Sequence, residues 1–224
     1  MIDSLNDLMA DPKNVVYVMS GRQPEELDST FRNAFGIGLI AENGCFIREY
    51  GPTARPWQSF VDLRKMKGWK KEARQILKYY LDRINGSTLE VRQCSMLFHY
   101  DNAENSRQAG ECAEQVNTAF KHMGVQAIPV PNTLIVEQTE FNKATAAVYI
   151  YNSLCETKMA PDFFMVAGND RDDEAAFRYA NMVMKDGCTV SIGRRNTEAQ
   201  ATLQGSTGLL GVLEMLPKAG GMLS

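Results

Sequence analysis

Histidine is scarce in this sequence, which holds only His99 and His122 among 224 residues. The two fall in different predicted elements, so the sequence gives little support for a serine–histidine hydrolase or for a histidine-rich metal site. The cysteines are odd in number and form no Cys-x-x-Cys pair; they are Cys45, Cys94, Cys112, Cys155 and Cys188. A disulfide scaffold and a thiolate zinc site are therefore not expected, and reduced thiols in a cytoplasmic protein are the simpler interpretation.

The sequence also lacks a basic excess and a long apolar run. Its 24 basic and 27 acidic residues give a formal charge of -3, which argues against a general nucleic-acid-binding protein. No apolar run approaches the roughly 18 residues that cross a bilayer. The first residues, MIDSLNDLMADPKN, show no basic stretch followed by an apolar one. We therefore expect neither a membrane span nor a secretory signal.

Short apolar strands that alternate with helices are the main pattern present. Residues 15–19, Gly38–Ala41 and 163–167 are apolar runs of the kind found in parallel sheets buried on both faces. Residues 188–192 form a similar strand, and residues 197–203 and 209–216 are predicted to be helical. This rhythm predicts a doubly wound α/β core.

The middle of the chain has a different character. After the loop at residues 51–56, an amphipathic helix is predicted over residues 69–84 and strand-like alternation over residues 89–100. A further helix and two strands follow, ending near residue 137. The sequence thus predicts a core formed by residues 1–48 and 141–224, with a second α/β domain, residues 49–140, inserted between them.

Two short polar sites follow predicted strands or open helices of the core. The hydroxyl of Ser20 and the backbone N–H groups at Gly21 could hold a phosphate oxygen at a helix start. Ser-Gly turns are common, so a plain turn is the alternative. Lys143 follows Asn142 at another helix start, where an ammonium group could neutralise a phosphate. Most lysines in such positions simply point into water.

The third polar site is an acidic loop after the strand at residues 163–167. Asp170, Asp172, Asp173 and Glu174 fall within five positions. Such oxygen-rich clusters suit Mg²⁺, a hard cation. The alternative is an acidic helix N-terminus, which the helix dipole favours without any ligand.

Taken in order, these anchors resemble the trehalose-6-phosphate phosphatase family of the haloacid dehalogenase-like (HAD-like) superfamily. The matching text is DPKNVV running into SGR, then LIAENGC, HY, NK, GNDRDDE and TVSIG, and it covers nearly the whole chain. The resemblance implies a HAD-like core with an inserted cap domain and a role in trehalose biosynthesis. It also implies a Mg²⁺-dependent hydrolase that takes trehalose 6-phosphate to trehalose and phosphate through an aspartate nucleophile and a second aspartate two residues later.

The family's site residues carry over one at a time. Ser20, with Gly21, matches the phosphate-binding serine motif, and Lys143 matches the phosphate-binding lysine. Asn169 and Asp173 match the acidic positions that bind or orient Mg²⁺. Glu42 and Arg92 match positions at which family members contact the sugar.

One departure from the family concerns the nucleophile. The family's first motif is an apolar strand ending in Asp-x-Asp-Gly-Thr, ahead of the DPKN segment, and that text occurs nowhere in this sequence. The nucleophile and the general acid are therefore not among these residues, and covalent catalysis of this type is not expected. Asn169 also replaces an aspartate, which removes one negative charge and predicts weak or lost Mg²⁺ binding.

The missing motif has a consequence for folding. In this superfamily its strand lies in the middle of the sheet, so the first central strand is predicted to be missing and its two neighbours to be left with unpaired backbone groups. Three explanations are open: the chain is a segment of a longer protein, a partner fills the gap in the sheet, or the sheet closes up differently.

Two functional hypotheses follow. The first is a regulatory or scaffolding module of a trehalose-synthase complex without its own turnover, a pseudoenzyme. The second is an active phosphatase whose first motif lies outside this chain.

Overall fold

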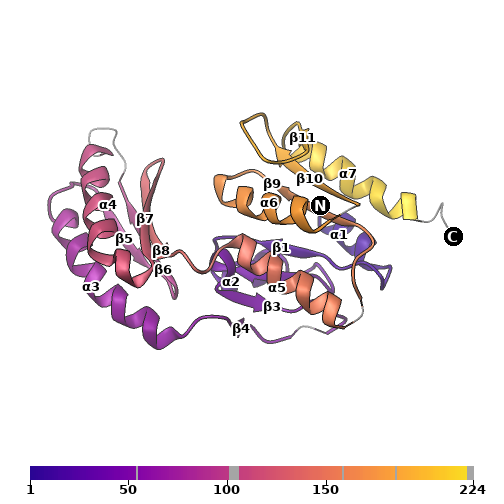
Figure 1. The fold of residues 1–224 in the computed structure, drawn as a ribbon, viewed down its shortest axis with the longest axis horizontal. Coiled ribbons are helices and arrows are strands. Elements are labelled where there is room, and N and C mark those ends of the chain that lie inside the picture. Colours follow the sequence, from indigo (N-terminus) through magenta and orange to yellow (C-terminus); the bar gives the residue numbers. More distant parts are fainter. Residues whose placement is uncertain (54, 101–105, 158, 185, 221–224) are drawn as a thin grey trace. The chain divides into compact units, whose positions relative to one another are not determined.

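A computed structural model describes residues 1–53, 55–100, 106–157, 159–184 and 186–220. The chain divides into two compact units, which are described separately (Figure 1). The first unit comprises Met1–Gln58 and Asn142–Ser224, and the second comprises Ser59–Phe141. Both units combine helices with sheets, as the α/β prediction requires.

The first unit contains two separate sheets. One has the order β1-β2-β3-β4, formed by Tyr17–Met19, Gly38–Ala41, Phe46–Arg48 and Gln58–Ser59. The other has the order β11-β10-β9, formed by Ala201–Leu203, Gly187–Ile192 and Phe164–Gly168. The β1–β2, β9–β10 and β10–β11 pairs are parallel, whereas β2–β3 is antiparallel.

Helices surround these two sheets and connect them. They are α1 (Ile2–Met9), α2 (Pro24–Thr30), α5 (Lys143–Glu156), α6 (Glu174–Val183) and α7 (Gly205–Gly220). Helix α6 packs on β9, β10 and α5, while α5 also contacts the turn that follows β2. Helix α1, which the sequence analysis missed, contacts α7. The two sheets are therefore joined through helices.

The segment expected to be helical at residues 197–203 is instead irregular and then forms β11, so that prediction is wrong. The backbone N–H groups of Glu198 and Gln200 donate to the side chains of Glu174 (2.7 Å) and Thr189 (2.9 Å). The N–H of Gly193 donates to the carbonyl of Leu203 (2.8 Å). Hydrogen bonds that a helix would make locally are thus made to neighbouring elements, and local periodicity does not reveal them.

Both β1 and β9 are edge strands. Within the described residues β1 pairs with β2 alone, and β9 pairs with β10 alone. The alternation of a ladder directs Val16 and Ser20 toward β2, so the backbone groups of Tyr17 and Met19 face the other way. Both strands were expected to be buried on both faces, yet every residue of β1 is half-buried and β9 ranges from buried Gly168 to exposed Ala167. Partial exposure allows water to satisfy backbone groups that would otherwise cost about 1–3 kcal/mol each.

The second unit is an α/β layer pair. Its antiparallel sheet has the order β5-β6-β8-β7, formed by Thr88–Val91, Ser95–His99, Thr133–Gln138 and Val125–Val130. The strand-like pattern at residues 89–100 thus covers two strands, β5 and β6, which pair as an antiparallel hairpin. Helices α3 (Leu63–Leu81) and α4 (Ser106–Phe120) pack together. The core of this unit consists of buried side chains of α3 and α4 and of buried side chains on one face of the sheet. It includes Met66, Trp69, Leu77, Met96, Phe98, Val116, Leu134 and Val136.

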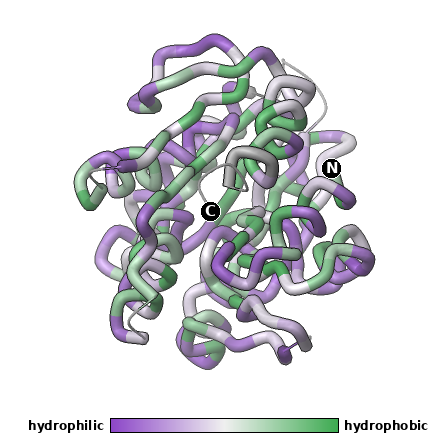
Figure 2. Tube along the Cα trace, turned by 90° about the vertical axis from the view of Figure 1, so that its right-hand side faces the viewer, coloured by the Kyte–Doolittle hydropathy of each residue, from purple (hydrophilic) through white to green (hydrophobic). Residues whose placement is uncertain are grey.

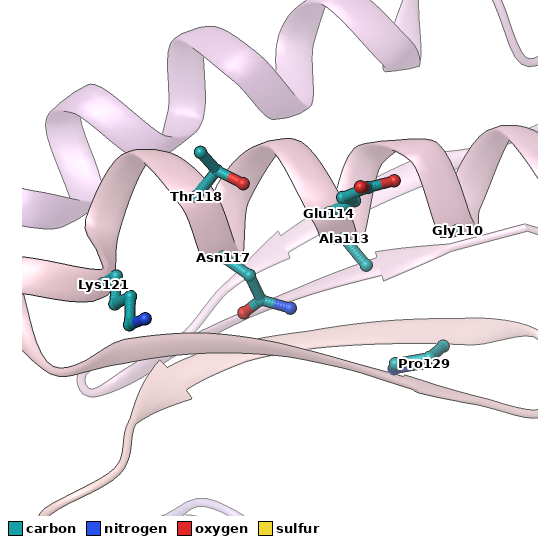
Figure 3. A pocket seen from close by; sticks show the side chains of 7 residues that line it. All are labelled: Gly110, Ala113, Glu114, Asn117, Thr118, Lys121 and Pro129. Atoms are coloured by element: carbon teal, nitrogen blue, oxygen red, sulfur yellow. The ribbon is translucent and has the colours of Figure 1, made fainter.

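Helix α4 protects the open edge of β7. The side chain of Asn117 accepts a hydrogen bond from the N–H of Ala127 (2.7 Å) and donates one to its carbonyl (3.1 Å). Two residues on, Pro129 has no N–H to offer at that edge. An open groove of about 590 Å³ lies beside these contacts (Figure 3). Its lining is Gly110, Ala113, Glu114, Asn117, Thr118, Lys121 and Pro129, none of which is a predicted site residue.

Hydrophobic and hydrophilic residues are interleaved along the coloured part of the trace (Figure 2). Among the described residues no helix combines the length and the apolar character needed to span a bilayer.

Replacing Asn117 should loosen the second unit. Asn117→Val removes both edge hydrogen bonds at similar helix propensity, so we expect the free energy of unfolding to fall by about 1–2 kcal/mol. Urea denaturation followed by Trp69 fluorescence in a Trp57→Phe background measures it. Thr118→Val, at the next exposed position of the same helix, is the control and should change stability by less than about 0.5 kcal/mol. Equal effects of the two variants would contradict the edge-sealing role.

Candidate active site

The N-terminus of α5 lies at the centre of the candidate site. Asn142 caps it, because its side-chain oxygen accepts hydrogen bonds from the N–H groups of Ala144 (2.9 Å) and Thr145 (3.0 Å). The Thr145 hydroxyl in turn accepts from the N–H of Asn142 (3.0 Å). This capping box fixes Lys143 as the first helical residue, with its side chain 11% exposed. An ammonium group therefore lies at the positive end of the helix dipole.

The turn after β2, η1 (Glu42–Gly44), packs against this helix end. Its residues have positive φ angles of 42°, 55° and 113°. A Cβ on Gly44 would lie 2.7 Å from the Asn142 carbonyl oxygen, so only glycine permits this approach. Glu42, predicted to contact the sugar, is buried, and its N–H donates to the carbonyl of Arg22 (2.9 Å).

The turn after β1 adjoins η1. The carbonyl of Ser20 accepts a hydrogen bond from the N–H of Asn43 (3.1 Å), and its hydroxyl oxygen accepts one from the N–H of Arg22 (3.2 Å). A Cβ on Gly21 would lie 3.2 Å from the Asn43 side-chain oxygen. The carboxyl ends of β1 and β2 therefore present Ser20 and Gly21 beside the turn that contacts the start of α5.

Asp173 is the acidic residue to which Lys143 is bound. Lys143 Nζ donates to Asp173 Oδ1 (2.7 Å), and both side chains are 11% exposed. Asp173 Oδ2 accepts from the N–H groups of Asn169 (2.8 Å) and Asp170 (2.9 Å). A Cβ on Gly168 would lie within 2.6 Å of three Asp173 atoms, so the strand end needs glycine there. Both oxygens of this carboxylate are thus engaged by protein donors.

A second cluster fixes α5 to the first sheet. The hydroxyl groups of Tyr17 and Tyr149 both donate to the carboxylate of Glu49, at 2.5 and 3.2 Å. Burial and the bond to Glu49 together raise the pKa of Tyr17 well above its usual range. The Tyr17 ring also lies directly over Gly38, where a Cβ would be 2.1 Å away. This cluster holds the helix that carries Lys143.

The predicted Mg²⁺ ligands, Asn169 and Asp173, do not fit that ion as they lie here. Asp173 already satisfies one lysine and two backbone amides, and Asn169 Nδ2 donates to Asp170 Oδ1 (3.1 Å). Among the residues that the structure describes, no group of three or more His, Cys, Asp or Glu side chains is placed to hold a metal. A hard cation needs about six oxygen ligands, and here both oxygens of Asp173 already accept hydrogen bonds from the protein.

Arg92, the other predicted sugar contact, belongs to the second unit. Its Nε donates to Glu90 Oε1 (2.7 Å), and this bond is the main cause that lowers the pKa of Glu90. His99 lies 3.4 Å from Glu90 Oε2 through Nε2 and 3.0 Å from the Thr133 hydroxyl through Nδ1. Lys70 donates to the carbonyl groups of Arg92 and Gln93. Arg92 is therefore part of a polar network on the cap sheet.

The first unit thus brings the predicted residues of the core to one end of its strands. Ser20, Gly21, Glu42, Lys143, Asn169 and Asp173 are linked through the start of α5 by the contacts given above. The roles assigned to them remain predictions. The sequence analysis missed Arg195, and it placed Glu174 in the acidic loop without a partner; the two side chains are bound to each other at 2.7 Å. The only sequence signal was an arginine pair after the Ser-Ile-Gly break that ends β10.

The core, with parallel β1–β2 and β9–β10–β11 pairs, an inserted α/β unit and polar turns at the carboxyl ends of its strands, has the architecture of the HAD-like class of proteins. The trehalose-phosphatase family model matches residues 1–207, and this chain belongs to that family.

Individual relatives agree with this assignment. A Schizosaccharomyces pombe protein that carries the name of an alpha,alpha-trehalose-phosphate synthase 100 kDa subunit is 38% identical over 96% of this chain. The Candida albicans trehalose synthase regulatory protein C-terminal domain superposes with a TM-score of 0.83 at 25% identity, covering 95% of this chain and 85% of that one. Aspergillus fumigatus trehalose-6-phosphate phosphatase gives 0.70 at 28% identity, covering 97% and 83%. This chain spans about a quarter of the curated relatives it matches, 25% in the first case.

Breaking the central ion pair should destabilise the first unit. Lys143→Met leaves Asp173 buried with two amide donors but no counter-charge, so we expect a loss of about 3 kcal/mol. Thermal or urea unfolding measures this, with Lys13→Met as a solvent-exposed control. The double variant Lys143→Met/Asp173→Asn should lose less than the sum of its single variants. Additive losses would show that the two side chains do not depend on each other.

Proposed function

We propose that this chain is a trehalose-phosphatase-like domain that binds a phosphosugar without turning it over by itself. The observation that carries the proposal is that the sequence contains no Asp-x-Asp-Gly-Thr motif, so the aspartate that forms the phospho-enzyme in this family is not among these residues. The chain would act as a regulatory or scaffolding module of a trehalose-synthase complex in the cytoplasm. The names of its relatives, a synthase subunit and a regulatory domain, support this direction.

Binding would use the residues gathered at the start of α5. Lys143 and the helix N-terminus supply positive potential, and Ser20 and Gly21 supply a hydroxyl and a backbone amide for a phosphate. The family resemblance assigns sugar contacts to Glu42 in the first unit and to Arg92 in the second unit, and each is proposed as a contact on that ground alone. Because Asp173 already neutralises Lys143 at 2.7 Å, the phosphate has to share that ammonium, and we expect weak affinity. Mg²⁺ binding would be weak or lost for the reasons of fit given above.

The first test is hydrolysis of trehalose 6-phosphate by the purified chain with Mg²⁺. We expect no phosphate release above a metal-only control, because the nucleophile is missing. Calorimetry at millimolar concentration should still show heat with trehalose 6-phosphate and none with trehalose, since the phosphate supplies the charged contact. Arg64→Ala, at an exposed position, serves as the control for Arg92→Ala, which should weaken binding. Phosphate release that disappears in Asp173→Ala would overturn the proposal.

A second candidate, an active Mg²⁺-dependent trehalose 6-phosphate phosphatase completed by a further strand, is favoured by the two open edges. β1 and β9 are both parallel strands of the first unit with half-buried apolar side chains. The start of α5 contacts both the turn after β2 and Asp173, beyond the end of β9. The carboxyl ends of both sheets therefore lie on the same side, and one strand between them could run parallel to each.

The second candidate is tested by adding such a strand. An apolar five-residue strand followed by Asp-x-Asp-Gly-Thr, joined ahead of Met1 by a Gly-Ser linker, should raise the melting temperature and restore Mg²⁺-dependent phosphate release. Release should vanish when the first aspartate of the added motif becomes asparagine, while the stability gain remains. A fusion that neither stabilises the chain nor restores turnover would exclude this candidate.

A further inference from the structure

The acidic turn is braced on the side away from Lys143 by a residue that the family resemblance did not point to. Arg195 lies in the irregular segment between β10 and β11, two residues after Gly193, whose φ is 93°. The N–H of Gly193 donates to the carbonyl of Leu203 (2.8 Å), which continues the parallel pairing of β10 with β11 by one bond. Just beyond this point the Arg195 side chain reaches the turn that follows β9.

All three kinds of guanidinium nitrogen on Arg195 are engaged. Nη1 donates to the Asn169 carbonyl (2.8 Å), Nη2 to Glu174 Oε1 (2.7 Å) and Nε to Ser191 Oγ (3.3 Å). The Arg195 and Glu174 side chains are 21% and 18% exposed. The three acceptors belong to β10, to the turn after β9 and to the first residue of α6. A planar guanidinium bound to all three holds these elements in a fixed arrangement.

Glu174 extends the brace back to the same segment. Its second oxygen, Oε2, accepts from the N–H of Glu198 (2.7 Å). The carbonyl of Glu198 accepts from Asn181 Nδ2 (2.9 Å), which lies on α6. The segment that carries Arg195 is therefore fastened at both ends.

Asn169 is held from both sides of its backbone. Its N–H donates to Asp173 Oδ2 (2.8 Å), while its carbonyl accepts from Arg195 Nη1 (2.8 Å). Because Asp173 is in turn bound to Lys143, the orientation of Asn169 and the position of the lysine depend on one continuous set of contacts. Releasing the carbonyl would free the residue to rotate and would relax the carboxylate that fixes the ammonium group.

We propose that Arg195 is a positioning residue of the candidate site: it fixes the Asn169–Glu174 turn, and through Asp173 it fixes Lys143. Three of its five N–H donors are engaged by the protein, and its proposed role is to hold these elements rather than to bind a ligand. The effect on a phosphosugar rests on the proposed function, whereas the effect on the turn does not.

The neighbouring Arg194 provides a matched control, because it is exposed and its removal costs the same charge. Hydrogen exchange by nuclear magnetic resonance on the whole chain should show exchange of the Asn169 and Asp170 amides faster by about tenfold in Arg195→Ala, with the β10 ladder amides unchanged. Arg194→Ala should alter neither set. Calorimetry with trehalose 6-phosphate should show affinity about tenfold lower in Arg195→Ala, with less than twofold change in Arg194→Ala.

Arg195→Lys and Glu174→Gln keep part of the brace and guard against a variant that fails to fold. Each should give exchange at Asn169 intermediate between wild type and Arg195→Ala. Equal loss of affinity in Arg194→Ala and Arg195→Ala would overturn the proposal, because charge alone would explain it. Unchanged exchange at Asn169 in all Arg195 variants would overturn it as well. If the wild-type chain binds no trehalose 6-phosphate, the proposed function fails, and the exchange result alone still supports or overturns the role of Arg195.

Discussion

The ion pair between Lys143 and Asp173 is the contact on which the first unit depends. It joins the first residue of α5 to the turn after β9, while Gly44 lets the turn after β2 touch the same helix end. The two sheets share no hydrogen-bonded ladder among the described residues, so the start of α5 is where the turns that follow β2 and β9 meet. The same pair also sets the electrostatics of the site, since this carboxylate accepts hydrogen bonds from a lysine and two backbone amides.

Much of the architecture could be predicted from local sequence. Apolar runs gave the strands at Gly38–Ala41 and Phe164–Gly168, Asn142 identified the start of α5, and the inserted α/β unit was expected from the change of pattern after residue 50. These features depend on neighbouring residues, which periodicity and capping rules describe. Helix α1 was missed, because eight residues with several polar side chains carry little pattern of their own.

The rest could not be predicted, because it depends on contacts between distant residues. Residues 197–203 have helical composition, yet Thr189 and Glu174 take their backbone N–H groups. The order of the motifs identified the candidate residues around α5. It did not show that both oxygens of Asp173 would accept hydrogen bonds from Lys143 and the turn amides. Arg195 was invisible for a related reason, since its partners lie 4 to 26 positions away and no spacing rule connects them.

Within the part of the chain that the structure describes, β1 and β9 each pair on one side only, whereas the outer edge of β7 is covered by Asn117, and this difference bears on how the polypeptide behaves in concentrated solution. Asn117 and Pro129 prevent another strand from pairing with the edge of β7. The edges of β1 and β9 have no such protection among the described residues, so strands of other molecules could pair with them. Precipitates formed on storage or heating would therefore be expected to nucleate in the first unit, with the inserted unit carried along in its native state. Solubility engineering of this molecule should begin at Tyr17–Met19 and Phe164–Gly168 rather than on the cap.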